Sequence, residues 1–473
     1  MSQWPDIDQL ALEVNSGKVS ALSLVEKSLK TIKDKSDFDA VISIIDDRSI
    51  KRAKEIDEKI SKGKNAGKLA GVPFIAKDNM LTFGSETTAA SNILKGFKAP
   101  YQATVIEKLE AEGAICVAKA NLDAFAHGSS TENSDFMVTK NPHDKKLVPG
   151  GSSGGSAAAV ILDMVPFALG SDTGGSIRLP AAFCGAVGYK PTYGVVSRNG
   201  VIAMASSTDV IGPIAKNVKD SATILEIIAG QDELDGTSIN LNSYDFKPKN
   251  YDLKGKTVGV IKELKDSDIT KTVQDKFDQT IDVLKRGGVN VVEVSFPLLE
   301  YSLACYYIIC PAEVSSNLSR YDGIKYGFSD STATTLDELY NQTRSIGFGK
   351  EAKRRIMLGT YVLSSGYYDA YYNQAQRLRT KLIEEYDLAF SKCDFILTPT
   401  SPDVAFPIGQ NVDDTMKMYL TDVLTVGASL TGIPAISVPA NVGSDLPVGI
   451  QIMAKQKDDA KLLSFSAALE GVL

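Results

Sequence analysis

Short apolar runs alternate with helical stretches through the second half of the chain. A helix is predicted from about Ile269 to Arg286, where the pair Gly287-Gly288 ends it. The predicted strands are Thr257 to Ile261, Val289 to Val294, Cys393 to Thr398, Ala435 to Val438 and Val448 to Met453. Strands that alternate with helices predict an α/β fold with a large mixed β-sheet that helices cover on both faces.

The chain divides into three segments of different character. Residues 1–65 are predicted to be helical, because Ser20 is a plausible N-cap and a charged helix follows from about Asp46 to Lys64. Residues 66–215 are rich in glycine, serine, threonine and alanine, whereas residues 216–473 carry the remaining strands and helices. We find no internal repeat and no low-complexity linker, so the sequence predicts a single domain over 1–473.

Composition argues against several classes of function. The net charge is −7, and no run of lysine and arginine resembles a surface that binds a phosphate backbone. This chain is therefore a poor candidate for the main nucleic-acid-binding surface. The N-terminus lacks the apolar stretch of a signal peptide, and no window of about 18 apolar residues predicts a membrane span. The five cysteines lack metal-ligand spacing, which is typical of buried thiols in a reduced compartment. We therefore expect a cytoplasmic protein.

Glycine and serine concentrate between Val148 and Pro180, where a plain turn, a phosphate cradle and a nucleophile loop are the alternatives. A phosphate loop is not supported, since no Gly-Lys-Ser/Thr follows. The run Gly151 to Gly155 satisfies G-x-S-x-G, the nucleophile elbow of α/β-hydrolases. That fold needs a histidine after the serine, however, and both histidines, His127 and His143, precede it. Neither H-E-x-x-H nor a Cys/His cluster occurs, so we predict no metal site.

A lysine can also activate a serine, provided that burial among hydroxyls lowers its pKa toward neutrality. The candidate is Lys77, at the end of an apolar run within Gly71 to Asn79 (GVPFIAKDN). On this run alone, a solvated lysine at the end of a strand is the more ordinary interpretation. Two further segments change that interpretation.

Three segments together resemble the amidase signature family. That family combines a lysine in G-[IV]-P-x-x-x-K-D, a bridging serine in G-G-S-S-G-G-S and a nucleophile in D-T-G-G-S-[IV]-R, and all three occur here in that order. The resemblance extends over most of the chain and implies the amidase signature fold. It also implies that Lys77 is the base, Ser152 the bridge and Ser176 the nucleophile, and that the Gly151–Ser152 peptide bond is cis.

The nucleophile segment holds further candidates. In Thr173-Gly174-Gly175 the backbone N–H groups can converge on a developing oxyanion, and the glycines lack the Cβ atoms that would block this approach. We interpret Asp172 and Arg178 as a supporting ion pair. Three residues depart from those usual in similar family members, and we expect none of them to touch the triad: Asp135, Ser171 and Leu179.

Four longer passages resemble the branch of the family that hydrolyses glutamine to supply ammonia to a tRNA-dependent amidotransferase: His127 to Phe136, Lys190 to Pro213, Ala304 to Gly327 and Phe348 to Tyr372. By motif, the glutamine pocket of that branch falls on Tyr306, Arg355 and Asp422. Tyr306 would donate a hydrogen bond, Arg355 would hold the α-carboxylate with both prongs of its planar fork, and Asp422 would hold the α-ammonium. The register can slip by one within Tyr306-Tyr307 and Arg354-Arg355, and a purely structural role for these side chains stays open.

The same resemblance implies partners. A B subunit would bind Glu-tRNA(Gln), or Asp-tRNA(Asn), and would use ATP and Mg²⁺, so we expect no cofactor in this chain. A small C subunit would wrap the interface and complete a heterotrimer. Two alternatives stay open: a stand-alone amidase for small or aryl amides, and a catalytically inactive interaction protein, against which the intact triad argues.

Overall fold

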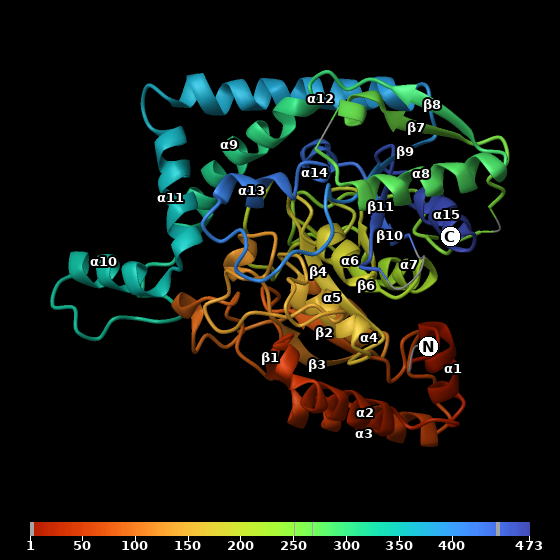
Figure 1. Cartoon of the computed structure of the whole chain (residues 1–473). Coiled ribbons are helices and arrows are strands. Elements are labelled where there is room, and N and C mark those ends of the chain that lie inside the picture. The colour runs from red at the N-terminus through yellow and green to blue at the C-terminus, as the bar shows by residue number, and fades with distance from the viewer. Residues whose placement is uncertain (1–3, 250, 267, 441–444) are drawn as a thin grey trace.

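A mixed sheet of eleven strands organises the computed structural model, which describes residues 4–249, 251–266, 268–440 and 445–473 (Figure 1). The strand order is β1-β3-β2-β4-β6-β5-β10-β11-β9-β7-β8. The strands are β1 (Val41–Ile44), β2 (Pro73–Lys77), β3 (Ile115–Ala120), β4 (Phe167–Asp172), β5 (Val187–Lys190), β6 (Val210–Ala215), β7 (Thr257–Ile261), β8 (Asn290–Val294), β9 (Phe395–Pro399), β10 (Ala435–Pro439) and β11 (Gly449–Ala454). Strand β2 runs parallel to β3 and β4, and β7 runs parallel to β8 and β9, whereas the other neighbours are antiparallel. The predicted mixed α/β fold is confirmed.

Helices surround this sheet. They are α1 (Ile7–Asn15), α2 (Ala21–Asp34), α3 (Asp46–Ser61), α4 (Thr104–Ala111), α5 (Gly154–Ile161), α6 (Arg178–Cys184), α7 (Val218–Ile228), α8 (Lys271–Arg286), α9 (Leu299–Leu318), α10 (Leu336–Gly347), α11 (Lys350–Leu363), α12 (Gln374–Phe390), α13 (Thr415–Leu420), α14 (Val426–Thr431) and α15 (Asp459–Glu470). Among the described residues, no helix is long and apolar enough to cross a membrane.

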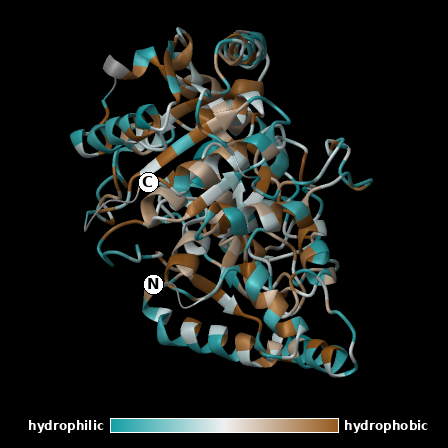
Figure 2. Ribbon diagram, turned by 90° about the vertical axis from the view of Figure 1, so that its right-hand side faces the viewer, coloured by the Kyte–Doolittle hydropathy of each residue, from teal (hydrophilic) through white to brown (hydrophobic). Residues whose placement is uncertain are grey.

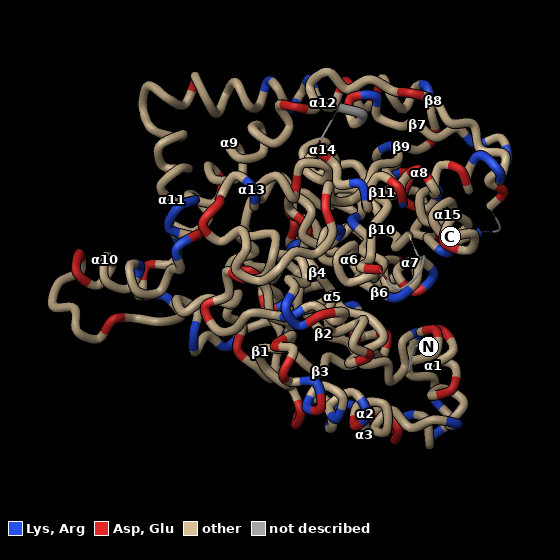
Figure 3. Tube along the Cα trace, viewed as in Figure 1, with Lys and Arg blue, Asp and Glu red and all other residues tan. Residues whose placement is uncertain are grey.

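The centre of the sheet is covered on both faces. All residues of β2, β3, β4, β6, β10 and β11 are buried, and the side chains of a strand alternate between its two faces. Helix α5 packs on β2 and β4, helix α6 packs on β5 and β10, and α15 packs on β10 and β11. Figure 2 shows hydrophobic residues along the central strands, and Figure 3 shows acidic and basic residues interspersed over the outer elements.

A second, smaller core lies beside the sheet, where α9 packs against α11, α12 and α14 (Figure 1). Helices α9 and α11 approach closely, since a methyl group on Gly359 would lie 1.9 Å from the carbonyl oxygen of Pro311. This second core carries the predicted pocket residue Tyr306, and its α11 carries Arg355. The packing of these helices therefore determines where the predicted pocket residues lie relative to the sheet.

The N-terminal segment is mostly helical, with α1, α2 and α3, but it also contains a strand. The Ser20 hydroxyl accepts a hydrogen bond from the backbone N–H of Ser23 (3.2 Å), so it caps α2 as predicted. The charged helix, however, ends at Ser61, and the segment predicted to be helical also contains strand β1. This strand has four residues, all half-buried, and pairs only with β3 at the edge of the sheet. A run that short has no clear period in the sequence.

Candidate active site

Lys77 ends β2 inside the molecule, where its side chain is fully buried. Its Nζ donates hydrogen bonds to the hydroxyl oxygens of Ser152 (2.8 Å) and Ser153 (2.9 Å). Burial lowers the pKa of Lys77 to about 7, although the charges of Asp123, Asp172 and Asp209 partly oppose this shift. The neutral amine, which can accept a proton, is therefore well populated near neutral pH.

Ser152 and Ser176 lie in two segments that contact each other. The Gly151–Ser152 peptide bond is cis, as the resemblance implied. The backbone N–H of Ser153 donates to the carbonyl oxygen of Ser176 (3.1 Å), which joins the bridge segment to the nucleophile segment. Among the described residues, the Ser176 hydroxyl has no hydrogen-bond partner, so the link from Ser152 to Ser176 is not closed in this geometry. Ser176 is 8% exposed, in contrast to the fully buried Ser152.

Ser171 corrects one expectation. We predicted that this position lies away from the triad, but its hydroxyl accepts a hydrogen bond from Lys77 Nζ (3.0 Å). The same hydroxyl accepts from Asn79 Nδ2 (3.0 Å), and the Ser171 carbonyl oxygen lies 3.4 Å from Lys77 Nζ. The last-but-one residue of β4 therefore belongs to the hydroxyl cluster around the lysine, because parallel pairing sets β4 beside β2.

The predicted oxyanion segment follows β4 directly, and its glycines are sterically required. Gly175 has a φ of +151°, which side chains rarely adopt, and a methyl group there would lie 2.3 Å from Thr425 Oγ1. A methyl group on Gly174 would lie 2.7 Å from the hydroxyl oxygen of Tyr306. The Thr425 hydroxyl donates to the Gly174 carbonyl oxygen (2.6 Å), while the Thr173 hydroxyl donates to Asp209 (2.7 Å). Side chains from distant parts of the chain thus fix this turn.

The predicted ion pair between Asp172 and Arg178 is present and spans the nucleophile turn. Arg178 Nη2 lies 2.9 Å from Asp172 Oδ1, and both side chains are fully buried. Burial raises the pKa of Asp172, but the charge and hydrogen bonds of Arg178, together with the charge of Lys190 and the Ile177 N–H, hold the pKa below its ordinary value. Asp172 also accepts from the backbone N–H of Ile177 (3.2 Å), which closes the turn around Ser176.

Two of the three predicted pocket residues, Tyr306 and Asp422, lie next to this turn. Tyr306 lies against Gly174, as described above, and Thr425 joins Gly174 to the carbonyl oxygen of Asp422 (3.0 Å from Thr425 Oγ1). The Asp422 carboxylate accepts from the hydroxyl of Ser129 (2.7 Å), and burial raises its pKa to about 7.

The structure also bears on the register of the two arginines. The Arg355 side chain is 3% exposed, whereas that of its neighbour Arg354 is 34% exposed. Arg355 Nε donates to Glu351 (2.9 Å), which leaves part of its fork without a carboxylate. Of the two arginines, Arg355 is therefore the buried cation.

Three further residues line the pocket: Tyr307, which the sequence offered only as the register alternative to Tyr306, and Tyr419 and Ser129, which it did not predict. The rings of Tyr307 and Tyr419 stack at 3.7 Å between centroids, and each lies within 6 Å of the Arg355 guanidinium carbon (5.5 and 5.8 Å). The Tyr307 hydroxyl also approaches Asp422 (3.4 Å), so this tyrosine touches both charged pocket residues. Ser129 is the third. Its passage, His127 to Phe136, was singled out as a whole, but nothing in the sequence indicated which residue meets Asp422.

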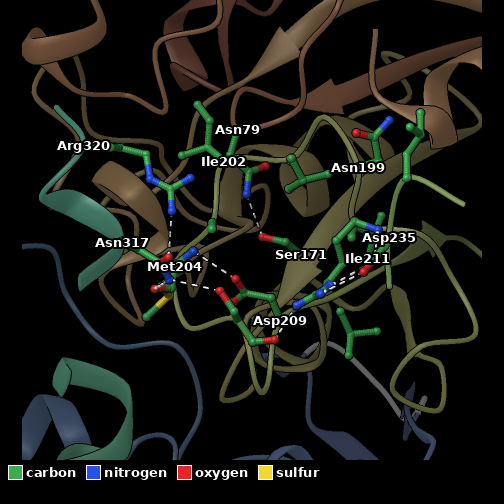
Figure 4. A pocket seen from close by; sticks show the side chains of 16 residues that line it. Asn79, Ser171, Asn199, Ile202, Met204, Asp209, Ile211, Asp235, Asn317 and Arg320 are labelled. Atoms are coloured by element: carbon green, nitrogen blue, oxygen red, sulfur yellow. Dashed lines mark hydrogen bonds and ion pairs between the residues drawn. The ribbon is translucent and has the colours of Figure 1, made fainter. Parts of the chain in front are cut away.

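Two cavities approach the site. One of about 70 Å³ is lined by Ser129, Glu351, Arg355 and Tyr419, and so opens onto the predicted glutamine pocket. A second cavity of about 230 Å³ has Asn79, Ser171 and Asp209 among its lining residues (Figure 4). Because Ser171 contacts Lys77 and Asp209 contacts Thr173, this second cavity adjoins both the base and the oxyanion segment.

The remaining candidates lie outside this chemistry. Burial lowers the pKa of His127 well below its ordinary value, and His143 Nε2 lies 2.9 Å from the Cys184 carbonyl oxygen. All five cysteines fall in the described part of the chain, where they are buried and form no disulfide. Among the described residues, no group of three or more His, Cys, Asp or Glu side chains is placed to hold a metal ion.

Comparisons with known proteins agree along nearly the whole chain. The family model described as amidase matches residues 23–463. A relative from Thermoanaerobacter pseudethanolicus, named as the A subunit of glutamyl-tRNA(Gln) amidotransferase, is 50% identical over 466 residues, which cover 98% of this chain and 95% of that protein. A relative of the same name from Carboxydothermus hydrogenoformans is 48% identical over 464 residues, with 98% and 96% coverage.

Solved structures give the same result. The crystal structure of the A subunit of glutamyl-tRNA(Gln) amidotransferase from Thermotoga maritima is 44% identical and has a TM-score of 0.79, covering 94% of this chain and 90% of that one. The peptide amidase from Stenotrophomonas maltophilia has a TM-score of 0.83 at 28% identity, with 99% and 97% coverage. The fold is therefore shared by enzymes with different amide substrates, and the pocket, not the fold, has to indicate the substrate.

Proposed function

The chain belongs to the amidase family, and on that premise we propose that it is the glutamine-hydrolysing subunit of a tRNA-dependent amidotransferase. The observation that carries this proposal is a buried, hydroxyl-bound lysine beside a pocket with one buried cation and one buried carboxylate. A lysine with a pKa of about 7 suits base catalysis at neutral pH. The two charges suit an amino-acid amide, which carries a carboxylate and an ammonium on the same carbon.

In this proposal Ser176 attacks the side-chain amide carbon of glutamine. Its proton passes to Ser152 while Ser152 gives its own proton to neutral Lys77. The backbone of Thr173, Gly174 and Gly175 donates to the oxyanion that forms. Lys77 then returns the proton through Ser152 to the leaving nitrogen, and ammonia departs. A glutamyl ester remains on Ser176, and water hydrolyses it by the same proton path to give glutamate.

Substrate recognition follows from the pocket charges. The guanidinium N–H groups of Arg355 that do not bond to Glu351 would bind the α-carboxylate. Asp422 in its ionised form would bind the α-ammonium. Tyr306 would donate its hydroxyl hydrogen bond from its place beside Gly174. An amidase for fatty or aryl amides would instead favour an apolar pocket, because such substrates carry neither an α-carboxylate nor an α-ammonium.

The ammonia would be used by a companion. The relatives' names mark them as one subunit of a larger amidotransferase, so this chain works as part of a multi-subunit enzyme. We assign the binding of Glu-tRNA(Gln), or Asp-tRNA(Asn), and the use of ATP and Mg²⁺ to a B subunit, while a small C subunit would cover the interface. The chain itself would then need no cofactor. Since charged tRNA is the acceptor, we expect the assembly to work in the cytoplasm.

A glutaminase assay with matched serine variants tests this function. Ser176→Ala should abolish ammonia release from L-glutamine. Ser156→Ala is the control, since Ser156 belongs to the same G-G-S-S-G-G-S run but bonds to the Leu169 carbonyl oxygen instead of Lys77. A higher kcat/KM for a small aryl amide than for glutamine would instead favour the stand-alone amidase.

A further inference from the structure

An exposed aromatic face covers the outer side of α11 and the turn after it. We define this face by six side chains with at least two-fifths of their surface exposed: Met357, Leu358, Tyr361, Tyr367, Tyr368 and Tyr371. Met357 is 73% exposed and Tyr361 is 47% exposed. Figure 1 shows α11 at the outer edge of the molecule, away from the central strands.

The tyrosines of the aromatic face are ordered by contacts with one another. The ring of Tyr361 lies 4.3 Å from that of Tyr367 and 6.1 Å from that of Tyr371, and the last two rings are 6.0 Å apart. Tyrosine and methionine are enriched in protein–protein interfaces, and clustered exposed apolar side chains of this kind mark docking sites. Along the sequence, exposed Lys350 and Lys353 precede the face and exposed Arg377 follows it, in a chain of net charge −7, while exposed Asp369 lies within the face.

Helix α11 also reaches the glutamine pocket from its other side. Ala352, Arg355, Gly359 and Val362 are buried and point toward α9. Arg355 Nη1 contacts Cys310 Sγ on α9 (3.7 Å), and Gly359 allows the backbones of the two helices to meet at Pro311. Because α9 carries Tyr306 and Tyr307, a shift of α11 would move the pocket residues of both helices together.

We propose that the aromatic face is the docking surface for a companion protein subunit, and that α11 transmits docking to Arg355 and so tunes glutamine binding. The companion would present an apolar surface that accepts the tyrosine rings, with an acidic rim opposite the flanking lysines and arginine. This inference rests on the proposed function, which supplies the companion. It adds the surface that the companion covers and the helix that couples it to the pocket.

Binding of the co-expressed B and C subunits tests the docking surface. Met357→Glu and Tyr361→Ala should each weaken retention of the companions, by about 30-fold or more for a residue at the centre of an interface. Leu12→Glu is the matched control, since Leu12 is an apolar residue of α1 with 62% exposure outside the aromatic face. Each isolated variant should keep its glutaminase kcat/KM and its Tm, because neither Met357 nor Tyr361 lies in the pocket.

A second measurement tests the coupling. Addition of the companions should lower KM for glutamine in the unaltered chain but leave KM for a simple amide without α-charges unchanged, since Arg355 contacts only the former. Equal changes for both substrates would overturn the coupling. If both variants still bound the companions, the proposed docking surface would be wrong. It would also be wrong if the variants assembled normally but the assembly no longer bound charged tRNA, because the face would then be an RNA contact. The glutaminase activity of the isolated chain, which tests the proposed function, does not depend on these outcomes.

Discussion

Lys77 and Lys119 are two buried lysines whose side chains contact different kinds of partner. Both end or lie near the end of neighbouring parallel strands, and both are fully buried. Lys119 forms an ion pair with the carboxylate of Asp78 (2.9 Å). Lys77 instead meets serine hydroxyls, which accept hydrogen bonds without a full negative charge. Of these two lysines, Lys77 is therefore the one in contact with the candidate bridging serine.

The first prediction concerns pH. Protonated Lys77 cannot accept a proton, so kcat/KM should fall as pH drops below about 7. Asp422 must be ionised to bind the α-ammonium, and its pKa of about 7 adds a second loss in the same direction. In a profile from about pH 5 to 8, log kcat/KM should therefore approach a slope of about two for glutamine at its acidic end, but about one for a simple amide without α-charges, and should level off above about pH 7. Asp422→Asn should reduce the glutamine slope to one, and a slope of two that persists in this variant would contradict the assignment.

The second prediction concerns the pocket cation. Arg355→Lys keeps the charge but loses the planar fork, so kcat/KM for glutamine should fall roughly 10²-fold. The simple amide should be nearly unaffected. Arg354→Lys is the matched control, since Arg354 also pairs with Glu351 (2.6 Å) but lies half-exposed. Steady-state kinetics on both amides measure the effect, and equal losses on the two substrates would mean that Arg355 is structural.

At the scale of elements, contiguous motifs were predictable and tertiary contacts were not. The nucleophile turn could be predicted because its residues follow one another between Asp172 and Arg178. Glu351 precedes Arg355 by four residues on a helix, a spacing that could have indicated their ion pair. Tyr419 meets Glu351 across 68 residues (3.2 Å), and only the packing of α13 against α11 brings them together. No local sequence pattern could have predicted the contact between Tyr419 and Glu351.

The third prediction concerns the turn after β4. Gly174→Ala would place a methyl group 2.7 Å from the Tyr306 hydroxyl oxygen and displace the oxyanion N–H groups. The loss of one such donor costs about 10²- to 10³-fold in kcat. In the Tyr306→Ala background the clash is absent, so the added cost of Gly174→Ala should be much smaller. A double-mutant cycle on kcat/KM for the simple amide measures this coupling.

A control separates the clash from a general effect of alanine. Gly236 has no atom near the position of an added methyl group, so Gly236→Ala should leave activity unchanged. Strictly additive losses in the cycle would mean that Tyr306 does not press on the nucleophile turn.

On the scale of the whole molecule, the proposed function divides one reaction between two chains. This chain carries the buried base, the nucleophile turn and a pocket for an amino acid, yet its net charge is −7. A tRNA-binding surface normally needs a concentration of basic residues, since phosphate neutralisation provides much of the affinity. The acidic chain therefore fits a source of ammonia, and in the proposed function the companion binds the acceptor. Free ammonium should then substitute for glutamine hydrolysis by this chain, but not for the amidation that the companion carries out.

The fourth prediction tests that division in the complete assembly. Ser176→Ala should eliminate formation of Gln-tRNA with glutamine as nitrogen donor, because no ammonia is released. Ammonium chloride at high concentration should restore it, because amidation of the tRNA-bound glutamate needs only the nitrogen. Ser156→Ala should support both donors. The measurement is Gln-tRNA yield with each donor in parallel, in assemblies of equal subunit content. If the wild-type assembly used ammonium and the Ser176→Ala assembly did not, the serine would have a role in the second reaction and the division of labour would be wrong.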